Sequence, residues 1–370
     1  MALSGAMSAG LSGMKSQMDA LTVVGNNVAN VNTYGYKPGR VTFKESIYST
    51  QAAGSDGTAL VGGTNPKQTG YGCSVGTIDL DMSTQNMEST GYAADVAIQG
   101  DGFFLLGDKA GVGLNNMDSL MLSRVGQFRI DNNGYLTDNY GNIVYGFVTC
   151  NGTTTENADG STTVTKEGEA GLNGDAISTQ LVPIRLPRAA NGSDTDPDGA
   201  EVGDAIFPGV DDGTGENVYG DFENYECISY RDLSIGADGK VICTNGKTGD
   251  PVTIGYVALG TVPNPNGLTH TEGPYYQALE GCGDLSISAP GGSLAGQYLN
   301  NVEAGEDGAT LATMLGDGSP SLLPGFLEAS GTDLATEFAN MIIYQRGYQA
   351  NTRIVTVTDT MLEELVNMKR

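Results

Sequence analysis

The chain has 370 residues, of which 55 are glycine and none is tryptophan, and its formal net charge is −26. Residues 151–270 hold 19 acidic and 6 basic residues, so half of the net charge lies in less than a third of the chain. This charge argues against nucleic-acid binding and against anionic membrane surfaces. The sequence has no apolar run long enough to cross a bilayer and no cleavable signal peptide at its N-terminus. We therefore expect a protein that stays in the cytosol or leaves by a route that keeps its N-terminus.

A heptad pattern marks the first element of the chain. Six apolar residues follow one another in steps of four and three, with Gly25 in a gap, which predicts one apolar seam along a helix. The residues of this seam are Met7, Leu11, Met14, Met18, Leu21 and Val28. The same pattern is also typical of a helix that lies on a globular core.

Asparagines crowd the end of this predicted helix. Asn27 and Asn30 belong to a residue type that disfavours helix interiors and favours caps and turns, so the helix should end near Asn30. Gly35 lies between two tyrosines and marks a turn that calls for a positive φ. An ordinary helix exit does not explain the density of asparagines, and we include these three residues among the candidate assembly residues.

Residues 49–72 are rich in glycine, serine, threonine and alanine, which is typical of a flexible linker or arm. Short strand patterns separated by glycine turns follow, including predicted turns at 99–102 and 131–134. Repeated short strands of this kind predict an antiparallel sandwich or barrel. We assign this β domain to residues 73–150 together with 271–329.

The acidic segment 151–270 has strand patterns of its own, and we predict that it is a separate outer β domain. A weak candidate for a metal site lies within it, at Asp194, Asp196 and Asp198. These residues match the opening half of a calcium loop, but the position of the closing glutamate holds Ala205. The favoured interpretation is an acidic, solvated surface loop.

No catalytic arrangement stands out. The single histidine, His270, has no serine or cysteine motif beside it, and no nucleotide-binding fingerprint follows a strand. We expect neither enzymatic activity nor a cofactor. The five cysteines are widely spaced without a C-x-x-C pair, so a zinc site is not expected. We favour unpaired thiols, and a disulfide between Cys227 and Cys243 is the alternative left open.

The longest helical pattern spans residues 334–368, and Ser330 or Asp333 can cap its start. Its first apolar stripe consists of Leu334, Phe338, Met341, Tyr348, Val355, Leu362 and Val366. Its second stripe consists of Ala339, Ile342, Ala350, Ile354, Val357, Met361, Leu365 and Met368. One stripe can pack on the N-terminal helix, and the other needs a further partner. We therefore predict that residues 1–48 and 330–370 form a coiled-coil hairpin from which a mainly β chain loops out.

Three blocks of the sequence resemble the bacterial flagellar rod and hook proteins, in the order in which that family has them. NNVANVNTYGYK, which starts at Asn26, is similar to the N-terminal signature of the family. The segment from Phe338 to Met368, FANMIIYQRGYQANTRIVTVTDTMLEELVNM, resembles its C-terminal helix. GFFLLGD and SRVGQFRIDNNGYLTDNYGNIVYGF resemble its β core. The long middle segment, 151–270, points to the hook members, because the rod proteins are generally shorter there.

The resemblance implies a structural subunit of a tubular polymer. The terminal helices would line an export channel, and the β domains would form outer layers that slide as the hook bends and passes torque to the filament. The implied partners are further copies of the chain, the rod, hook-cap and hook–filament junction proteins, and the flagellar type III export apparatus. The implied location is the hook and basal body, reached by export without a cleaved signal peptide, with neither membrane insertion nor nucleic-acid binding.

Two other functions are left open by the sequence. A distal-rod protein would use the same ends in a stiffer tube. A secreted calcium-binding adhesin or glycan-active β protein would use the acidic β-rich middle, but it would leave both helical ends unexplained.

Overall fold

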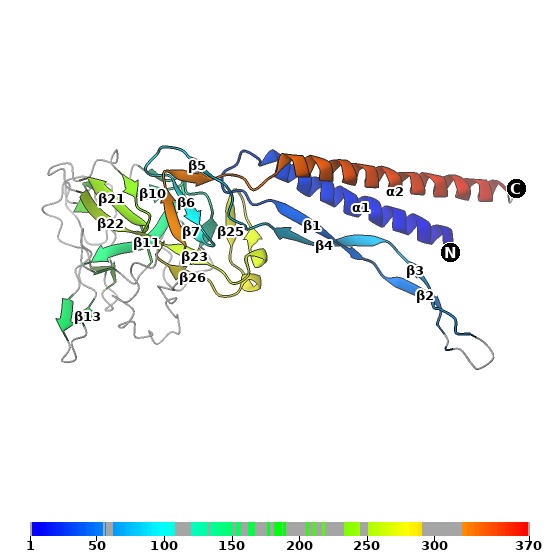
Figure 1. The fold of residues 1–370 in the computed structure, drawn as a ribbon, viewed down its shortest axis with the longest axis horizontal. Helices are drawn as coiled ribbons and strands as arrows, with labels where there is room; N and C mark the ends of the chain where they lie inside the picture. The colour runs from blue at the N-terminus through cyan, green and yellow to red at the C-terminus, as the bar shows by residue number, and fades with distance from the viewer. Residues whose placement is uncertain are drawn as a thin grey trace. The chain divides into compact units, whose positions relative to one another are not determined.

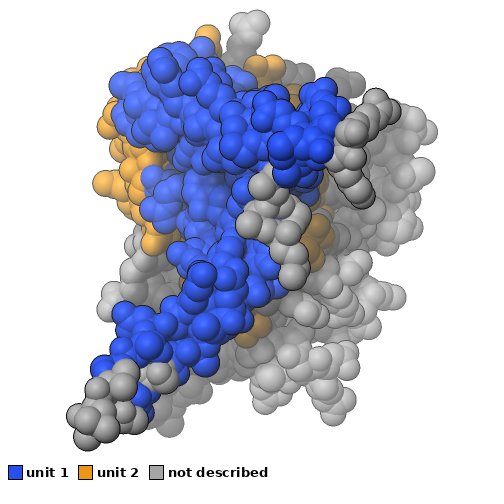
Figure 2. All heavy atoms as spheres, turned by 90° about the vertical axis from the view of Figure 1, so that its right-hand side faces the viewer, with its two compact units in different colours: residues 1–81, 330–370 blue, residues 82–329 orange. Residues whose placement is uncertain are grey.

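The computed structural model describes residues 2–54, 56, 62–107, 120–131, 134–150, 181–186, 188–189, 233–244, 251–290 and 320–368, with further short strand segments between 153 and 218. The chain divides into two compact units, residues 1–81 with 330–370 and residues 82–329, which Figure 2 colours blue and orange. The first unit is therefore built from both ends of the chain.

Two long helices form the body of unit 1. α1 spans Ala2–Ala29 and α2 spans Leu334–Met368. They run side by side and antiparallel, so that the two chain termini lie at the same end of the pair (Figure 1). The predicted pairing of terminal helices is confirmed.

Two antiparallel strand pairs complete unit 1. β1 (Gly39–Glu45) pairs with β4 (Cys73–Leu80), and both strands pack against α1. β2 (Tyr48–Ala52) pairs with β3 (Lys67–Gly70) in a two-stranded ribbon that continues from the first pair (Figure 1). Composition predicted residues 49–72 to be a flexible linker, whereas their described part includes this ribbon. Cross-strand amide–hydroxyl bonds support it, because Gln68 Nε2 donates to Thr50 Oγ1 at 3.1 Å.

A sheet of 14 antiparallel strands forms the centre of unit 2. Its main path is β20 (Ser234–Ile235), β21 (Lys240–Thr244), β22 (Pro251–Val257), β11 (Ile143–Cys150), β7 (Phe103–Gly107), β8 (Met121–Ser123), β25 (Tyr275–Gln277) and β24 (Thr269–His270). Joined to this path are β9 (Arg129–Ile130), β10 (Leu136–Thr137), β14 (Ala176–Ile177), β15 (Val182–Pro183), β23 (Leu259–Thr261) and β26 (Ser286–Ser288). The predicted fold class, mainly antiparallel β with terminal helices, is confirmed.

Smaller strand pairs lie outside this sheet. They are β5 (Met87–Ser89) with β28 (Phe326–Glu328), β6 (Val96–Gln99) with β27 (Ser321–Pro324), β12 (Thr153–Glu156) with β13 (Thr162–Lys166), β16 (Arg188–Ala189) with β17 (Ala205–Ile206), and β18 (Val210–Asp211) with β19 (Asn217–Val218). Two short 3₁₀ helices span Pro265–Gly267 and Glu280–Cys282. The first two strand pairs join segments from the beginning and the end of unit 2.

Two glycine turns lie between strands where the sequence predicted them. The turn at 99–102 separates β6 from β7, and the turn at 131–134 joins β9 to β10. In the second turn, Gly134 N donates to Asp131 O at 3.1 Å. The core behind these strands is apolar, with Phe104 and Phe128 meeting edge to face at 5.0 Å between ring centroids.

The acidic segment is described only in part. Its residues 233–261 contain β20 to β23, and β22 pairs directly with β11 from Gly146↔Val257 to Val148↔Gly255. This end of the segment therefore shares its sheet with strands that precede residue 151. Most of residues 151–232 lie outside the described residues, so their assignment to an outer domain of their own stays a prediction.

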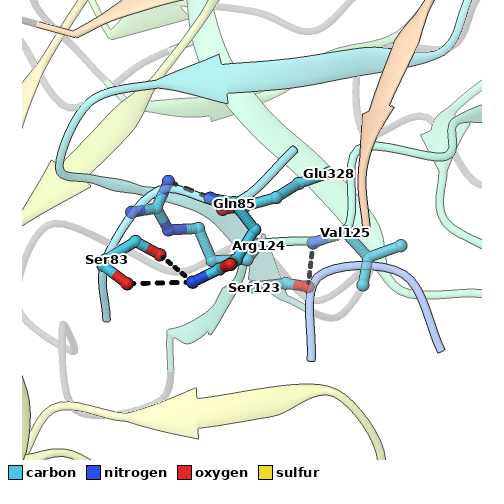
Figure 3. A network of polar contacts seen from close by, with 6 residues as sticks. All are labelled: Ser83, Gln85, Ser123, Arg124, Val125 and Glu328. Carbon is cyan, nitrogen blue, oxygen red and sulfur yellow. Dashed lines mark hydrogen bonds and ion pairs between the residues drawn. The ribbon is translucent and has the colours of Figure 1, made fainter. Parts of the chain in front are cut away.

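A buried ion pair links distant segments of unit 2 (Figure 3). Arg124 Nη1 lies 3.8 Å from Glu328 Oε2, and both side chains are almost fully buried. Glu328 Oε1 also accepts from Gln85 N at 2.9 Å, and the Arg124 guanidinium lies 5.5 Å from the centroid of the Phe103 ring. Burial lowers the pKa of Arg124, and the Glu328 carboxylate opposes that change. The pair joins β28, at the end of the unit, to the segment after β8 and to residue 85 near its start.

We predict that Glu328→Gln destabilises unit 2 by about 3–5 kcal/mol, because it leaves the buried Arg124 charge without its counter-charge. Urea unfolding followed by circular dichroism measures the change. The matched control is Asp79→Asn, which breaks the 3.7 Å pair between exposed Arg40 and half-buried Asp79 and should cost less than about 1 kcal/mol. Equal effects of the two variants would contradict the role given to burial.

Candidate assembly interface

Small side chains line much of the buried face of α1, which packs against α2 and against β1 and β4. Among the residues of α1 whose burial is described, the buried ones are Gly10, Gly13, Ser16, Ala20, Val24 and Asn27. Their spacing of three and four places them on one face of the helix. A Cβ atom on Gly13 would lie 2.6 Å from the Asn351 side chain, and one on Gly347 would lie 3.0 Å from that of Gln17. The two backbones can approach this closely because glycine occupies these positions.

The heptad seam predicted in α1 is not this contact. Leu11 and Met18 are 62% and 54% exposed, and Met7 is exposed as well, while Met14, Leu21 and Val28 are half-buried. Met7, Leu11 and Met18 therefore do not pack within the chain, because a glycine- and alanine-lined face lets the helices approach more closely than large side chains would. As residues of an assembly surface, the six stay a prediction.

The two stripes of α2 differ in how much α1 covers them. On the first stripe, Met341, Tyr348 and Val355 are half-buried, whereas Leu334, Phe338, Leu362 and Val366 are exposed. On the second stripe, all the large side chains are exposed, and these are Ile342, Ile354, Val357, Met361, Leu365 and Met368. Every residue from 359 to 368 is exposed. Much of the apolar surface of α2 is therefore uncovered within one chain.

Asn27 is the polar centre of unit 1, and it is only 1% exposed. Its Nδ2 donates to Gly39 O at 2.9 Å and to Glu337 Oε1 at 3.0 Å. Its Oδ1 accepts from Tyr36 OH and from Gly39 N, both at 3.0 Å. Two donors and two acceptors are the full capacity of an amide side chain, so Asn27 is completely satisfied. One side chain thereby ties α1 to the chain after the turn and to the first turn of α2.

The other turn residues hold the exit from α1. Asn30 Nδ2 donates to Asn26 O at 2.9 Å, and Thr33 Oγ1 donates to Asn30 Oδ1 at 3.2 Å. Gly35 has φ of 67°, as predicted, a conformation that side chains with a Cβ rarely adopt. Burial raises the pKa of Tyr36, and the nearby Glu337 carboxylate adds to the rise.

The predicted cap of α2 is confirmed at Asp333. Its Oδ1 accepts from Ala335 N at 3.0 Å, and its Oδ2 accepts from Thr336 Oγ1 at 2.6 Å. The hydrogen bonds from Thr336 and Ala335 lower the pKa of Asp333. Ser330 instead accepts from Thr332 N just before the helix.

Other candidates from the sequence do not form a site. His270 is exposed, and its Nδ1 lies 2.7 Å from Thr271 O. Asp194, Asp196 and Asp198 lie outside the described residues, and the residues that are described contain no group of three or more histidine, cysteine or acidic side chains suited to a metal.

The side chains of three cysteines can be described. Cys243 is buried in unit 2, and Cys282 Sγ donates to Leu279 O at 2.9 Å. Cys73 Sγ lies 3.1 Å from Ser16 Oγ, where β4 meets α1. Cys227 lies outside the described residues, so its predicted alternative of a disulfide is untested. In the parts of the chain that can be described, no helix is both long and apolar enough to span a membrane.

Comparison with known proteins finds family matches at both ends of the chain, which together form unit 1. The family profile "Flagella basal body rod protein" matches residues 7–37, and "Flagellar basal body rod FlgEFG protein C-terminal" matches residues 323–368. These are α1 with its exit turn and the end of unit 2 with α2.

Full-length relatives extend the similarity over the middle of the chain. Flagellar basal-body rod protein FlgG of Bacillus subtilis (strain 168) is 34% identical over 364 residues, covering 98% of this chain and 97% of that protein. Flagellar hook protein FlgE of Borreliella burgdorferi is 25% identical over 457 residues, covering 97% of this chain and 98% of that protein. FlgE of Escherichia coli (strain K12) is 26% identical over 433 residues, covering 98% and 100%.

The chain therefore belongs to the flagellar rod and hook protein family. It is a structural component of the bacterial flagellum, and each of its two terminal helices lies in the region that one of the two family profiles matches.

We predict that acid weakens the start of α2 through Asp333. Its folded-state pKa is lowered from 3.8, so the stabilisation is fully present above that value and is lost as the pH falls through the folded-state pKa. Helicity of the wild type measured between about pH 5 and about pH 2 should fall more than that of Asp333→Asn, which can cap without titrating. Identical acid profiles of the two proteins would count against this cap.

Proposed function

We propose that the chain is a structural subunit of the flagellar hook and polymerises through its terminal helices. One observation carries the proposal: the helix pair leaves a long apolar surface uncovered. It includes Leu11 and Met18 on α1 and most large side chains of α2, up to Val366 at 68% and Met368 at 78% exposure. Monomeric soluble proteins rarely expose contiguous apolar surface of this kind, so a partner is expected to cover it.

Further copies of the same chain are the partner that fits this surface best. Each copy offers apolar stripes on two helices, and neighbouring helices can bury these stripes against one another. Burial stabilises by about 25 cal/mol for each Å² of apolar surface, so several such side chains at each contact supply a large driving force. The candidate assembly residues of both helices therefore stay our proposal for the subunit interface.

In such a polymer the helix pairs form the inner tube around the export channel, and unit 2 supplies the outer layer that shifts as the hook bends. The hook passes motor torque to the filament as a universal joint. The rod adjoins it at one end and the hook-cap and hook–filament junction proteins at the other. Subunits reach it through the flagellar type III export apparatus.

A distal-rod subunit is the second candidate, and the 34% identity to a rod protein, FlgG, favours it. The hook proposal has the support of full-length alignments with two hook proteins and of the long acidic segment. Family membership and the helix pair argue against an adhesin or a glycan-active protein, since neither function explains the matched ends.

Electron microscopy of the purified polymer separates hook from rod. A hook subunit should give curved, flexible tubes, and cells lacking the gene should retain rods but carry no hooks. Straight, stiff tubes, or cells that lack the distal rod, would establish the second candidate instead.

We predict that Phe338→Asp or Leu362→Asp abolishes polymerisation while the monomer stays folded. Both side chains are partly exposed in the monomer, but a charge in a dry subunit contact costs several kcal/mol. The matched control is Thr356→Asp, which places the same charge at an exposed polar position of α2. Circular dichroism checks the fold and electron microscopy checks the polymer. Normal tubes from both apolar variants would remove the exposed part of the first stripe from the interface.

A further inference from the structure

α2 carries apolar side chains on more than one face. Met341, Tyr348 and Val355 are half-buried, and Val355 lies against Gly10 of α1, whereas Ile342 and others of the second stripe are exposed. Hydrophobic stabilisation depends on the area buried and has no direction of its own. Apolar burial alone therefore discriminates weakly between packing the first stripe on α1 and packing the second.

A polar contact favours packing of the first stripe on α1 over packing of the second stripe. Asn27 Nδ2 donates to Glu337 Oε1 at 3.0 Å, and this is the one side-chain hydrogen bond that joins the described parts of α1 and α2. Glu337 precedes the half-buried residues Met341, Tyr348 and Val355 by four, eleven and eighteen positions, so it lies on their face of the helix. Turning the second stripe toward α1 would carry Glu337 away from Asn27.

Breaking this bond is costly because Asn27 is buried. Its other three hydrogen-bonding positions are already filled by Gly39 and Tyr36, and a buried amide donor without an acceptor loses its full solvation. The glycine contacts agree with the same arrangement, since Gly13 meets Asn351 and Gly347 meets Gln17. These two contacts and the Asn27–Glu337 hydrogen bond belong to the same antiparallel alignment of α1 with α2.

We infer that Asn27 and Glu337 are positioning residues that select which apolar face of α2 packs on α1 and which face stays uncovered. A single buried polar pair that chooses among apolar packings has this role in coiled coils. The selection is a property of the chain itself. Its consequence, that the second stripe is the face offered to other subunits, rests on the proposed function.

Disulfide trapping in the full-length chain tests the selection. The pair Gln17→Cys with Gly347→Cys reports the packing described here, and Gln17→Cys with Ala350→Cys reports packing of the second stripe. Both pairs are made with Cys73→Ser, because Cys73 lies beside Ser16. Peptide mass spectrometry gives the yield of each cross-link. The readout is the yield of the cross-link between positions 17 and 347 divided by the yield of the cross-link between positions 17 and 350.

We expect Asn27→Ala to lower this ratio about tenfold, the effect of losing a hydrogen bond to a charged group. Glu337→Gln should keep the ratio within about twofold, because the amide oxygen still accepts from Asn27. Asn27→Asp should lower the ratio, and adding Glu337→Gln should restore it toward the wild-type value, since the new amide donates to the new carboxylate. The matched control is Asn26→Ala, which removes a hydrogen bond to Tyr36 but none to α2, and it should leave the ratio unchanged.

An unchanged ratio in Asn27→Ala, the joint loss of both cross-links, or no recovery in the double variant would overturn the inference. Electron microscopy of polymers from the same Asn27 variants, without the introduced cysteines, separates this result from the proposed function. A lowered ratio with normal polymers would leave the face selection standing and count against the proposed use of the second stripe.

Discussion

The close contact between α1 and α2 is the constraint on which unit 1 depends. Its glycine-lined face brings together residues that are more than 300 positions apart, and Asn27 completes its hydrogen bonds only when Glu337 is in place. Neither helix has enough buried apolar surface of its own to be stable alone, since isolated helices are marginal in water. Because unit 2 lies between the two helices in the sequence, the whole of unit 2 must be synthesised before α1 and α2 can pair.

In the assembly that we propose, this arrangement separates two tasks of one helix pair. Small residues and one polar pair hold the helices together, and the large apolar residues are left on the outside. A helix pair that hid Leu11, Met18 and Ile354 internally would be more stable as a monomer and would have less surface to offer in assembly. The distribution of side-chain sizes thus favours assembly over the stability of the single chain.

Local patterns predicted much of this structure. The cap at Asp333, the positive φ of Gly35 and the two glycine turns of unit 2 follow from the chemistry of a few adjacent residues, and the structure confirms them. The inner face of α1 was missed because periodicity was judged from large apolar residues, whereas the packed positions are mostly Gly, Ser and Ala. Asn27 was recognised as a candidate, but as a turn former, because its partner Glu337 is distant in the sequence. The Arg124–Glu328 pair was missed for the same reason.

The way the chain enters and leaves unit 2 has a mechanical consequence. The chain passes between the units twice, after residue 81 and after residue 329, and the two passages are joined on the unit 2 side by the pairing of β5 with β28 and by the hydrogen bond from Ala329 N to Asn86 O. A force that pulls the units apart is thus shared by the two covalent chain connections and by the paired strands β5 and β28, which hold these connections together.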